Sequence, residues 1–227
     1  MAFPETGKAY NPLPSLNPIL VPPPGLDLIY RDESLIVVNK PAGLLAVPGR
    51  GADKQDCLAS RVQAEFPDAL VVHRLDMATS GLLLFARGAE MQRRLSHLFR
   101  ERLVAKRYVA MVSGRLELLA GEIDLPLMRD WPNRPRQKVD HESGKPSLTR
   151  YRVLAHDDGT TRVELEPVTG RTHQLRVHMA ASGHPILGDA LYGEEGRAER
   201  LLLHASALSF LHPLNAEPLS FASEPPF

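Results

Sequence analysis

Short apolar runs separated by turn-forming residues constrain the fold of this chain most. Residues 26–30 and 35–39 are rich in β-forming side chains and flank Arg-Asp-Glu-Ser, so they predict a hairpin. Similar runs predict further strands at residues 69–72, 82–86, 106–114, 147–154, 161–167 and 201–213. Helical patterns do not alternate regularly with these runs. The sequence therefore predicts an α+β fold with a mixed, mainly antiparallel central sheet and flanking helices and loops.

Three segments have the periodicity of amphipathic helices. In residues 56–66 the apolar side chains lie four apart, with Asp56 as the expected N-cap and Pro67 as the stop. In residues 89–104 one face is apolar and the other carries arginines. The third helix is expected to open near Thr169 and to close at Gly183.

The N-terminal residues differ in composition from the rest. Residues 1–24 hold seven prolines and predict an extended, flexible tail, and residues 25–227 predict one compact catalytic domain. The start lacks the basic and apolar regions of a secretory signal, and no apolar run approaches the roughly 18 residues of a membrane helix. We therefore expect a cytoplasmic protein that does not bind membranes. The single cysteine, Cys57, is expected to be a small packed residue.

Basic residues are concentrated locally although the net charge is zero. Residues 87–107 contain seven basic and two acidic side chains, and residues 128–146 interleave five more basic residues with Trp131. Such patches can follow a phosphate backbone and offer a stacking surface for bases. A solvated helix face would also account for the first patch.

The nonapeptide His-Arg-Leu-Asp-Met-Ala-Thr-Ser-Gly at residues 73–81 puts polar side chains between two apolar strands. Burying such groups is costly unless they are paired or used. In an extended segment Arg74 and Asp76 would point the same way, and the arginine would keep the carboxylate ionised. This pattern fits either a functional carboxylate or a structural Asp–Arg pair that closes a turn.

The same nonapeptide resembles the signature of the RluA family of pseudouridine synthases. Further segments resemble that family in the same order, and together they cover most of residues 26–225: VVNKPAGLLAVPG (37–49), KRYVA (106–110), DWPNRPRQKV (130–139), GKP (144–146), PVTGRTHQLRVHMAASGHPILGD (167–189) and RLLLHA (200–205). The resemblance implies the pseudouridine synthase fold, with the active site in a cleft across the sheet. The N-terminal S4-like domain of longer relatives is not expected.

The resemblance also implies three catalytic residues. Asp76 corresponds to the nucleophile of the family, which detaches uracil from its sugar so that it can be rejoined through C5. Attack at C1′, attack at C6 and assisted elimination to a glycal all remain open. Tyr108 corresponds to the tyrosine that packs on the base and takes part in proton removal, and Arg176 to the basic partner of the aspartate. No cofactor and no metal is implied.

A second group of residues is expected to bind the RNA. Arg74 is expected to enter the space left by the flipped uridine, and Leu202 or Leu203 to cover the base. Residues expected to contact RNA more generally are Arg94, Arg100, Arg136 and Lys138. The DWPNRPRQK segment resembles the family member that modifies both 23S rRNA and tRNA, so we expect a 23S rRNA uridine and an anticodon stem-loop uridine as targets of a monomeric enzyme.

Rival functions find less support in the residues. His173 and His178 lie five apart, which does not suit a helical zinc site, and Ser80-Gly81 lacks the pattern of a hydrolase nucleophile. His73, His204 and His212 are expected to be hydrogen-bonded structural residues or RNA contacts. A non-catalytic RNA-binding module on the same fold would predict a damaged motif, whereas Asp76, Tyr108 and Arg176 are all present. Another uridine within the same family also remains open.

Overall fold

A computed structural model describes residues 25–194 and 196–227 of the chain; the predicted tail, residues 1–24, lies outside the described residues. Ten of its strands form one sheet in the order β1-β2-β4-β11-β5-β10-β9-β6, with β3 paired to β4 and β12 paired to β11. The strands of this sheet are β1 (Asp27–Arg31), β2 (Leu35–Lys40), β3 (Ala69–Val71), β4 (Ser80–Arg87), β5 (Ala105–Ser113), β6 (Ala120–Asp124), β9 (Leu148–Asp157), β10 (Thr160–Pro167), β11 (Leu203–Leu211) and β12 (Pro218–Ala222). A separate hairpin pairs β7 (Leu127–Arg129) with β8 (Gln137–Val139).

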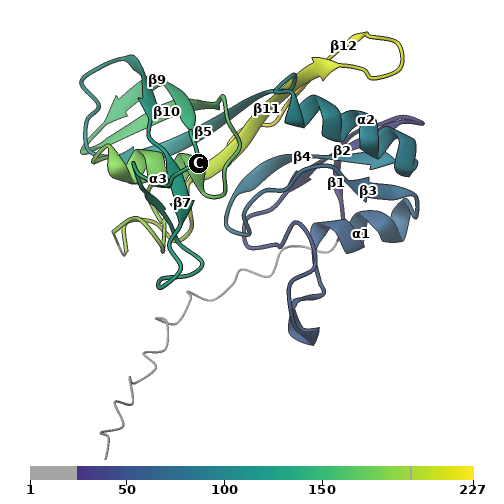
Figure 1. The fold of residues 1–227 in the computed structure, drawn as a ribbon, viewed down its shortest axis with the longest axis horizontal. Helices are drawn as coiled ribbons and strands as arrows, with labels where there is room; N and C mark the ends of the chain where they lie inside the picture. Colours follow the sequence, from purple (N-terminus) through teal and green to yellow (C-terminus); the bar gives the residue numbers. More distant parts are fainter. Residues whose placement is uncertain (1–24, 195) are drawn as a thin grey trace, which may run out of the picture.

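The helices confirm the three predicted segments. They are α1 (Leu58–Glu65), α2 (Gly88–Arg100) and α3 (Gln174–Ala181), with a short 3-10 turn at Ala52–Lys54. Alternate side chains of β2 and β4 face opposite ways, so Val38 and Phe85 pack with α1 while Val37 and Leu84 pack with α2. Helices α1 and α2 accordingly cover opposite faces of this half of the sheet (Figure 1). The predicted mixed α+β class is therefore confirmed.

Two predicted helix starts were wrong. Cys57, not Asp56, caps α1: its sulfur accepts from the Ser60 amide at 3.3 Å, and Ser60 Oγ accepts from the Cys57 amide at 3.2 Å. Asp56 lies one residue too early and pairs with Arg61 instead. Helix α3 begins at Gln174 and not near Thr169, because Thr169 Oγ1 bonds to the Gln174 side chain and holds residues 168–173 as a loop.

Strands β4 and β11 pair in parallel, and this pairing joins the two halves of the sheet. All other strand pairings among the described residues are antiparallel. Gly81 lies opposite Ala205 with φ +113°, and a Cβ atom at Gly81 would lie 2.5 Å from the Ala205 backbone nitrogen. Only glycine permits this approach. The neighbouring Ser80 Oγ bonds to Nδ1 of the buried His204 at 2.9 Å. Figure 1 shows β11 running between the β1–β4 half and the β5–β10 half.

Gly81→Ala tests this close approach. The added methyl group meets backbone atoms that cannot move aside, and the positive φ adds strain, so we expect the free energy of unfolding to fall by at least about 2 kcal/mol. Urea unfolding measures the loss. Gly159→Ala is the control, since its φ is also positive at +63° but nothing lies within 4 Å of the added carbon. Equal losses in the two variants would contradict a packing role for Gly81.

Candidate active site

The loop that carries Asp76 is held in place by backbone contacts. It connects β3 to β4 and ends at the β4–β11 join. The Met77 carbonyl accepts hydrogen bonds from the Gly43 amide at 2.9 Å and from Lys40 Nζ at 3.0 Å. The Thr79 amide donates to the Asp76 carbonyl at 3.1 Å. Met77, the residue that follows Asp76, is therefore held by hydrogen bonds to the end of β2 and to Gly43 just after it.

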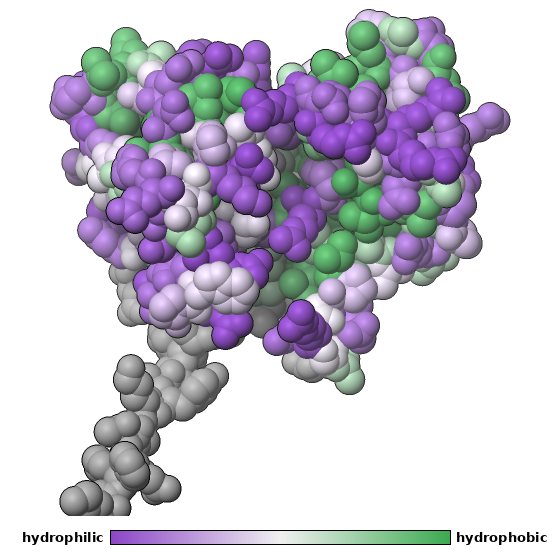
Figure 2. Space-filling model, viewed as in Figure 1, coloured by the Kyte–Doolittle hydropathy of each residue, from purple (hydrophilic) through white to green (hydrophobic). Residues whose placement is uncertain are grey.

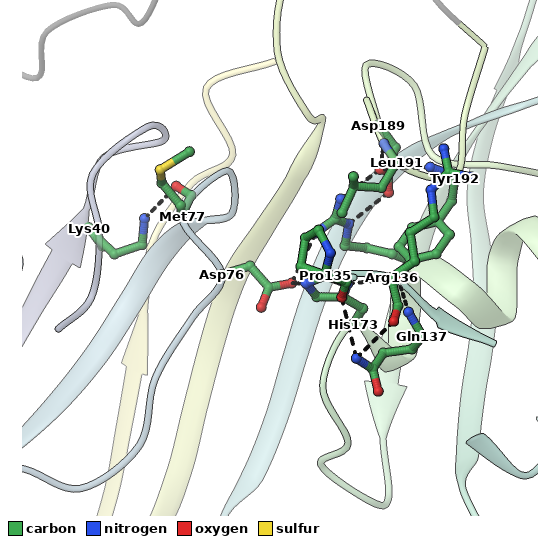
Figure 3. Close-up of polar contacts among 11 residues, drawn as sticks. Lys40, Asp76, Met77, Pro135, Arg136, Gln137, His173, Asp189, Leu191 and Tyr192 are labelled. Carbon is green, nitrogen blue, oxygen red and sulfur yellow. Dashed lines mark hydrogen bonds and ion pairs between the residues drawn. The ribbon is translucent and has the colours of Figure 1, made fainter. Parts of the chain in front are cut away.

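Lys40 is fully buried beneath this loop. Its Nζ donates to the carbonyls of Pro41 and Leu44, each at 2.8 Å, as well as to that of Met77 (Figure 3). Burial lowers the pKa of Lys40 to about 7, and the negative charge of Asp76 opposes this change. Lys40 lies in the family-like segment 37–49 but was not predicted as a site residue, because neither its burial nor its distant acceptor can be seen in the local pattern.

Arg176 is the main partner of Asp76. Its Nε and Nη2 donate to both oxygens of Asp189 at 2.7 Å, and Nη1 donates to Asp76 Oδ2 at 3.3 Å. Both Arg176 and Asp189 are buried, with side chains 6% and 1% exposed, while Asp76 remains 28% exposed. The two-pronged pairing with Asp189 fixes the plane of the guanidinium group. Arg176 therefore directs its remaining N–H group at Asp76.

Asp189 was not singled out in the sequence, although it closes one of the segments that resemble the family. Gly188, with φ +72°, lies so close to the Arg200 backbone that a side chain would not fit. The Asp189 carboxylate also accepts from the amides of Leu191 and Tyr192 at 2.9 and 3.2 Å. The charge of Asp189 is thus stabilised by a guanidinium group and by backbone donors.

The predicted local pair between Arg74 and Asp76 is not formed. Within residues 25–194 and 196–227, no ion pair joins the two side chains, and the second group near Asp76 is His173, whose Nε2 lies 3.7 Å from Oδ2. The segment around Asp76 is not part of a strand, so the alternation expected for extended chains does not apply. Arg74 is exposed and lines the cleft described below.

Tyr108 lies on β5 at the centre of the sheet. It is paired in register with Ala205 on β11 and with Leu165 on β10. Burial, reinforced by the negative charge of Asp76, raises the pKa of Tyr108 above its usual range. The phenol is therefore neutral at physiological pH, and its ring is available for packing against a base.

A cleft of ≈ 600 Å³ is lined by Asp76, Tyr108, His173 and Arg176. Figure 2 shows the surface hollowed between the two halves of the molecule. This volume lies in the range of small-molecule sites. The lining contains a single carboxylate, that of Asp76. Its basic side chains are more numerous: Arg74, Arg100, Arg102, Lys106, Arg171 and Arg176. Such a site favours an anionic ligand.

The other predicted RNA-binding residues are distributed unevenly. Arg100 and Leu203 line the cleft, whereas Leu202 and Arg94 are not among its lining residues. Arg94 pairs with Glu90 at 2.8 Å and donates to the Pro213 carbonyl. Arg102 and Lys106, which also line the cleft, belong to the basic segment 87–107 predicted to follow a phosphate backbone, whereas Arg171 was not predicted as an RNA contact.

The hairpin β7–β8 carries the remaining predicted residues. Arg136 is exposed in its loop, and Lys138 pairs with Asp140 at 3.1 Å. Trp131 is 57% exposed, and the guanidinium groups of Arg129 and Arg134 lie 4.9 and 5.3 Å from the centre of its ring. An exposed aromatic ring among arginines provides a surface on which bases can stack.

The histidines weighed against metal binding have hydrogen-bonding partners. His178 is buried and contacts Thr149 Oγ1 at 2.9 Å and the Leu125 carbonyl at 3.0 Å. His73 Nε2 accepts from the Leu84 amide, and His204 bonds to Ser80 and Ser223. The part of the chain that the structure describes holds no group of side chains suited to a metal ion. None of its helices is both long and apolar enough to cross a membrane.

Comparison with known proteins shows the family of this chain. A family model described as RNA pseudouridylate synthase matches residues 34–181. Proteins named dual-specificity RNA pseudouridine synthase RluA from Yersinia pestis and Escherichia coli K12 are 52% and 50% identical, covering 88% and 90% of this chain and 99% and 95% of theirs. The structure of human RNA pseudouridylate synthase domain containing 1 is 32% identical, with a TM-score of 0.74 over 90% of this chain and 85% of that one.

The fold, the cleft and these relatives define an RNA pseudouridine synthase, an enzyme that isomerises uridine to pseudouridine within RNA. Within that class the chain belongs to the RluA family.

Lys40→Met tests the burial of the lysine. The pKa of Lys40 is about 7 in the folded chain and about 10.4 when unfolded. Between these values the unfolded chain binds more protons, so the folded state gains stability as the pH rises. The free energy of unfolding of the wild type should increase by about 2 kcal/mol relative to Lys40→Met between about pH 7 and about pH 9.

Urea unfolding at several pH values measures this difference. For Lys54→Met, which replaces an exposed lysine, the free energy of unfolding should depend on pH in the same way as for the wild type. The same pH dependence in Lys40→Met and in the wild type would mean that the three carbonyl groups keep Lys40 charged in the folded chain.

Proposed function

We propose that this enzyme modifies one uridine in 23S rRNA and one in a tRNA anticodon stem-loop, with Asp76 as the nucleophile. The observation that carries the proposal is the state of the Asp76 carboxylate: Oδ2 contacts Arg176, and the side chain is still 28% exposed in a basic cleft. The contact leaves Oδ1 for the substrate. A carboxylate that is held on one oxygen and free on the other is suited to nucleophilic attack.

The chemistry requires three things of the site. The glycosidic bond must break, the detached uracil must stay bound while it turns, and the proton on C5 must leave after C5 has joined the sugar. Asp76 can act by attack at C1′, by attack at C6 or by assisting elimination to a glycal, and Oδ1 is the reacting atom in each route. Tyr108, as a neutral phenol beside Asp76, is better suited to hold the base than to remove the proton unaided.

The cleft supports a flipped-out uridine as the substrate form. Stacked bases must be extruded before an enzyme can reach the glycosidic bond. We assign Arg74, exposed at the cleft, to the space that the uridine leaves, and Leu203 to one face of the base. Arg100, Arg136 and Lys138 would then contact the phosphate backbone. Arg94, already paired with Glu90, would contribute less.

Two findings support the dual target. Relatives of about half identity bear the name dual-specificity RNA pseudouridine synthase. The hairpin β7–β8 also presents Trp131 and its arginines, which suits the single-stranded loops that RNA-binding proteins read by stacking. We further propose that residues 25–227 act as one catalytic domain, because ten of the described strands form a single sheet. We also propose that the enzyme is a monomer in the cytoplasm.

Asp76→Asn tests the nucleophile. The substitution keeps the shape of the side chain and removes its charge, so the rate of isomerisation should fall by at least about 10³-fold while RNA binding changes little. Release of tritium from [5-³H]uridine in tRNA and in 23S rRNA fragments measures turnover, and chemical mapping locates the product. The assay contains EDTA and no nucleotide.

Product formed by the wild type on both RNAs would support the dual target. Product on only one RNA would restrict the substrate to that RNA. Substantial activity in Asp76→Asn would contradict the role of Asp76. RNA binding without product by the wild type would instead favour a binding module.

Arg100→Ala tests the phosphate contacts. Loss of one contact should weaken RNA binding and reduce the slope of log K against log salt by about 0.7 to 0.9. Filter binding across a salt series measures both quantities. Arg115→Ala is the matched control, because Arg115 is exposed and does not line the cleft. An unchanged slope in Arg100→Ala would show that Arg100 is solvated surface in the complex as well.

A further inference from the structure

His173 connects the nucleophile to a residue outside the cleft lining. Its Nε2 faces Asp76 Oδ2 at 3.7 Å, and its Nδ1 lies 2.7 Å from the Tyr192 hydroxyl group. The same hydroxyl oxygen accepts a hydrogen bond from the Gln137 amide at 2.7 Å. Figure 3 shows Asp76, His173, Tyr192 and Gln137 following one another in space. A chain of contacts thus leads from the hairpin β7–β8 to Asp76.

The contacts favour one tautomer of the neutral His173 ring. Since the Tyr192 oxygen accepts from Gln137, its own hydrogen is free to be donated, and Nδ1 of His173 lies at hydrogen-bonding distance. Nδ1 is then the acceptor, so the neutral ring carries its proton on Nε2, the nitrogen that faces Asp76. Asp76 Oδ2 consequently accepts a hydrogen bond from Arg176 and faces the N–H group of His173 at 3.7 Å, an electrostatic contact longer than a hydrogen bond.

The electrostatic environment favours the protonation states that this arrangement needs. Burial raises the pKa of the Tyr192 phenol, which therefore keeps its hydrogen. Burial lowers the pKa of His173, against the opposing effect of Asp76, so the imidazole is neutral near pH 7. Arg176, whose guanidinium lies 5.2 Å above the Tyr192 ring, also disfavours a second positive charge at His173.

The backbone of His173 is strained. It adopts the left-handed conformation at φ 54°, directly before the first residue of α3. This conformation is unfavourable for a residue with a side chain. Strain of this kind persists where surrounding contacts hold it, often at functional sites. At His173 the contact that holds the side chain is the one to Tyr192.

We propose that Tyr192 and His173 are positioning residues: Tyr192 fixes His173 so that its Nε2–H group orients Asp76, and it also fastens the hairpin β7–β8 to the site. This inference rests on the proposed role of Asp76 as nucleophile. Neither residue reacts with the uridine. Together with Arg176 they hold Oδ2 of Asp76, and this leaves Oδ1 directed at the substrate.

Tyr192→Phe is the decisive variant. It removes one oxygen and keeps the ring beneath Arg176. We expect the single-turnover rate at saturating RNA to fall about tenfold, the effect of losing one orienting hydrogen bond, and the dissociation constant for RNA to change by less than this factor. Tyr30→Phe is the matched control, because the Tyr30 hydroxyl bonds only to Asp32 at 2.8 Å among the described residues, on strand β1. Its rate should equal that of the wild type.

His173→Asn tests whether Tyr192 acts on Asp76 through His173. Asparagine tolerates the left-handed conformation, and its short amide can replace Nδ1 as the acceptor from Tyr192 but does not reach Asp76. We expect a rate loss at least as large as that of Tyr192→Phe. The double variant should be no slower than His173→Asn alone, since Tyr192 acts through His173.

The possible outcomes separate this inference from the proposed function. An unchanged rate in Tyr192→Phe, or rate losses that multiply in the double variant, would overturn the positioning role while Asp76→Asn remains inactive. A weaker affinity for RNA with an unchanged saturating rate would also overturn it, since the hydroxyl would then serve only the hairpin. Activity in Asp76→Asn would instead remove the proposed function itself.

Discussion

The close contact of Gly81 with Ala205 is the constraint on which the active site depends. Ala205 is paired with Gly81 on one side and with Tyr108 on the other, so one row of residues crosses β4, β11 and β5. Asp76 lies just before β4, and Tyr108 lies on β5. The separation of these two side chains is therefore set by how closely β4 approaches β11. A side chain at residue 81 would force the two halves of the sheet apart and widen the cleft between them.

Electrostatic pairing then fixes Asp76, the proposed nucleophile, within this frame. A buried guanidinium group is costly unless it is fully paired, and Asp189 supplies most of that pairing for Arg176 at 2.7 Å. The contact with Asp76 is longer, at 3.3 Å, and Asp76 is more exposed. The strong pair thus positions the arginine, and the weaker pair directs the carboxylate without enclosing it. A nucleophile has to remain accessible, so this asymmetry suits the chemistry.

The sequence allowed the prediction of most local structure but little of the long-range arrangement. The hairpin of β1 and β2 and the three helices were predicted because their patterns are local. The pairing of Ser80 with His204, 124 residues apart, has no local signal. Short strands such as β6 and β12 were missed because their apolar residues are too few to show a period. Cys57 was expected to be packed, which is confirmed, but its use as a helix cap was not foreseen.

The site residues show the same difference between what a local pattern predicts and what long-range contacts decide. Asp76, Tyr108 and Arg176 were predicted through their resemblance to the family, and the structure brings all three to one cleft. Lys40 and Asp189 were not predicted, because what distinguishes them is burial beside partners distant in sequence. His173 was considered only as a metal ligand. Its left-handed backbone and its contact with Tyr192 depend on how the loop after β10 meets the segment after α3, which no periodicity encodes.

The hairpin β7–β8 is the element best placed to couple RNA binding to chemistry. It forms its own two-stranded sheet, and an isolated hairpin of this size has little stability of its own. Its attachments include the bridge between Leu127 and Lys145 and the Gln137 amide donating to Tyr192. RNA that contacts Trp131 or Arg136 would therefore act on an element whose anchor is also the partner of His173. In the proposed dual-target enzyme, the large sheet would keep the catalytic geometry constant while this hairpin contacts differently shaped RNA loops.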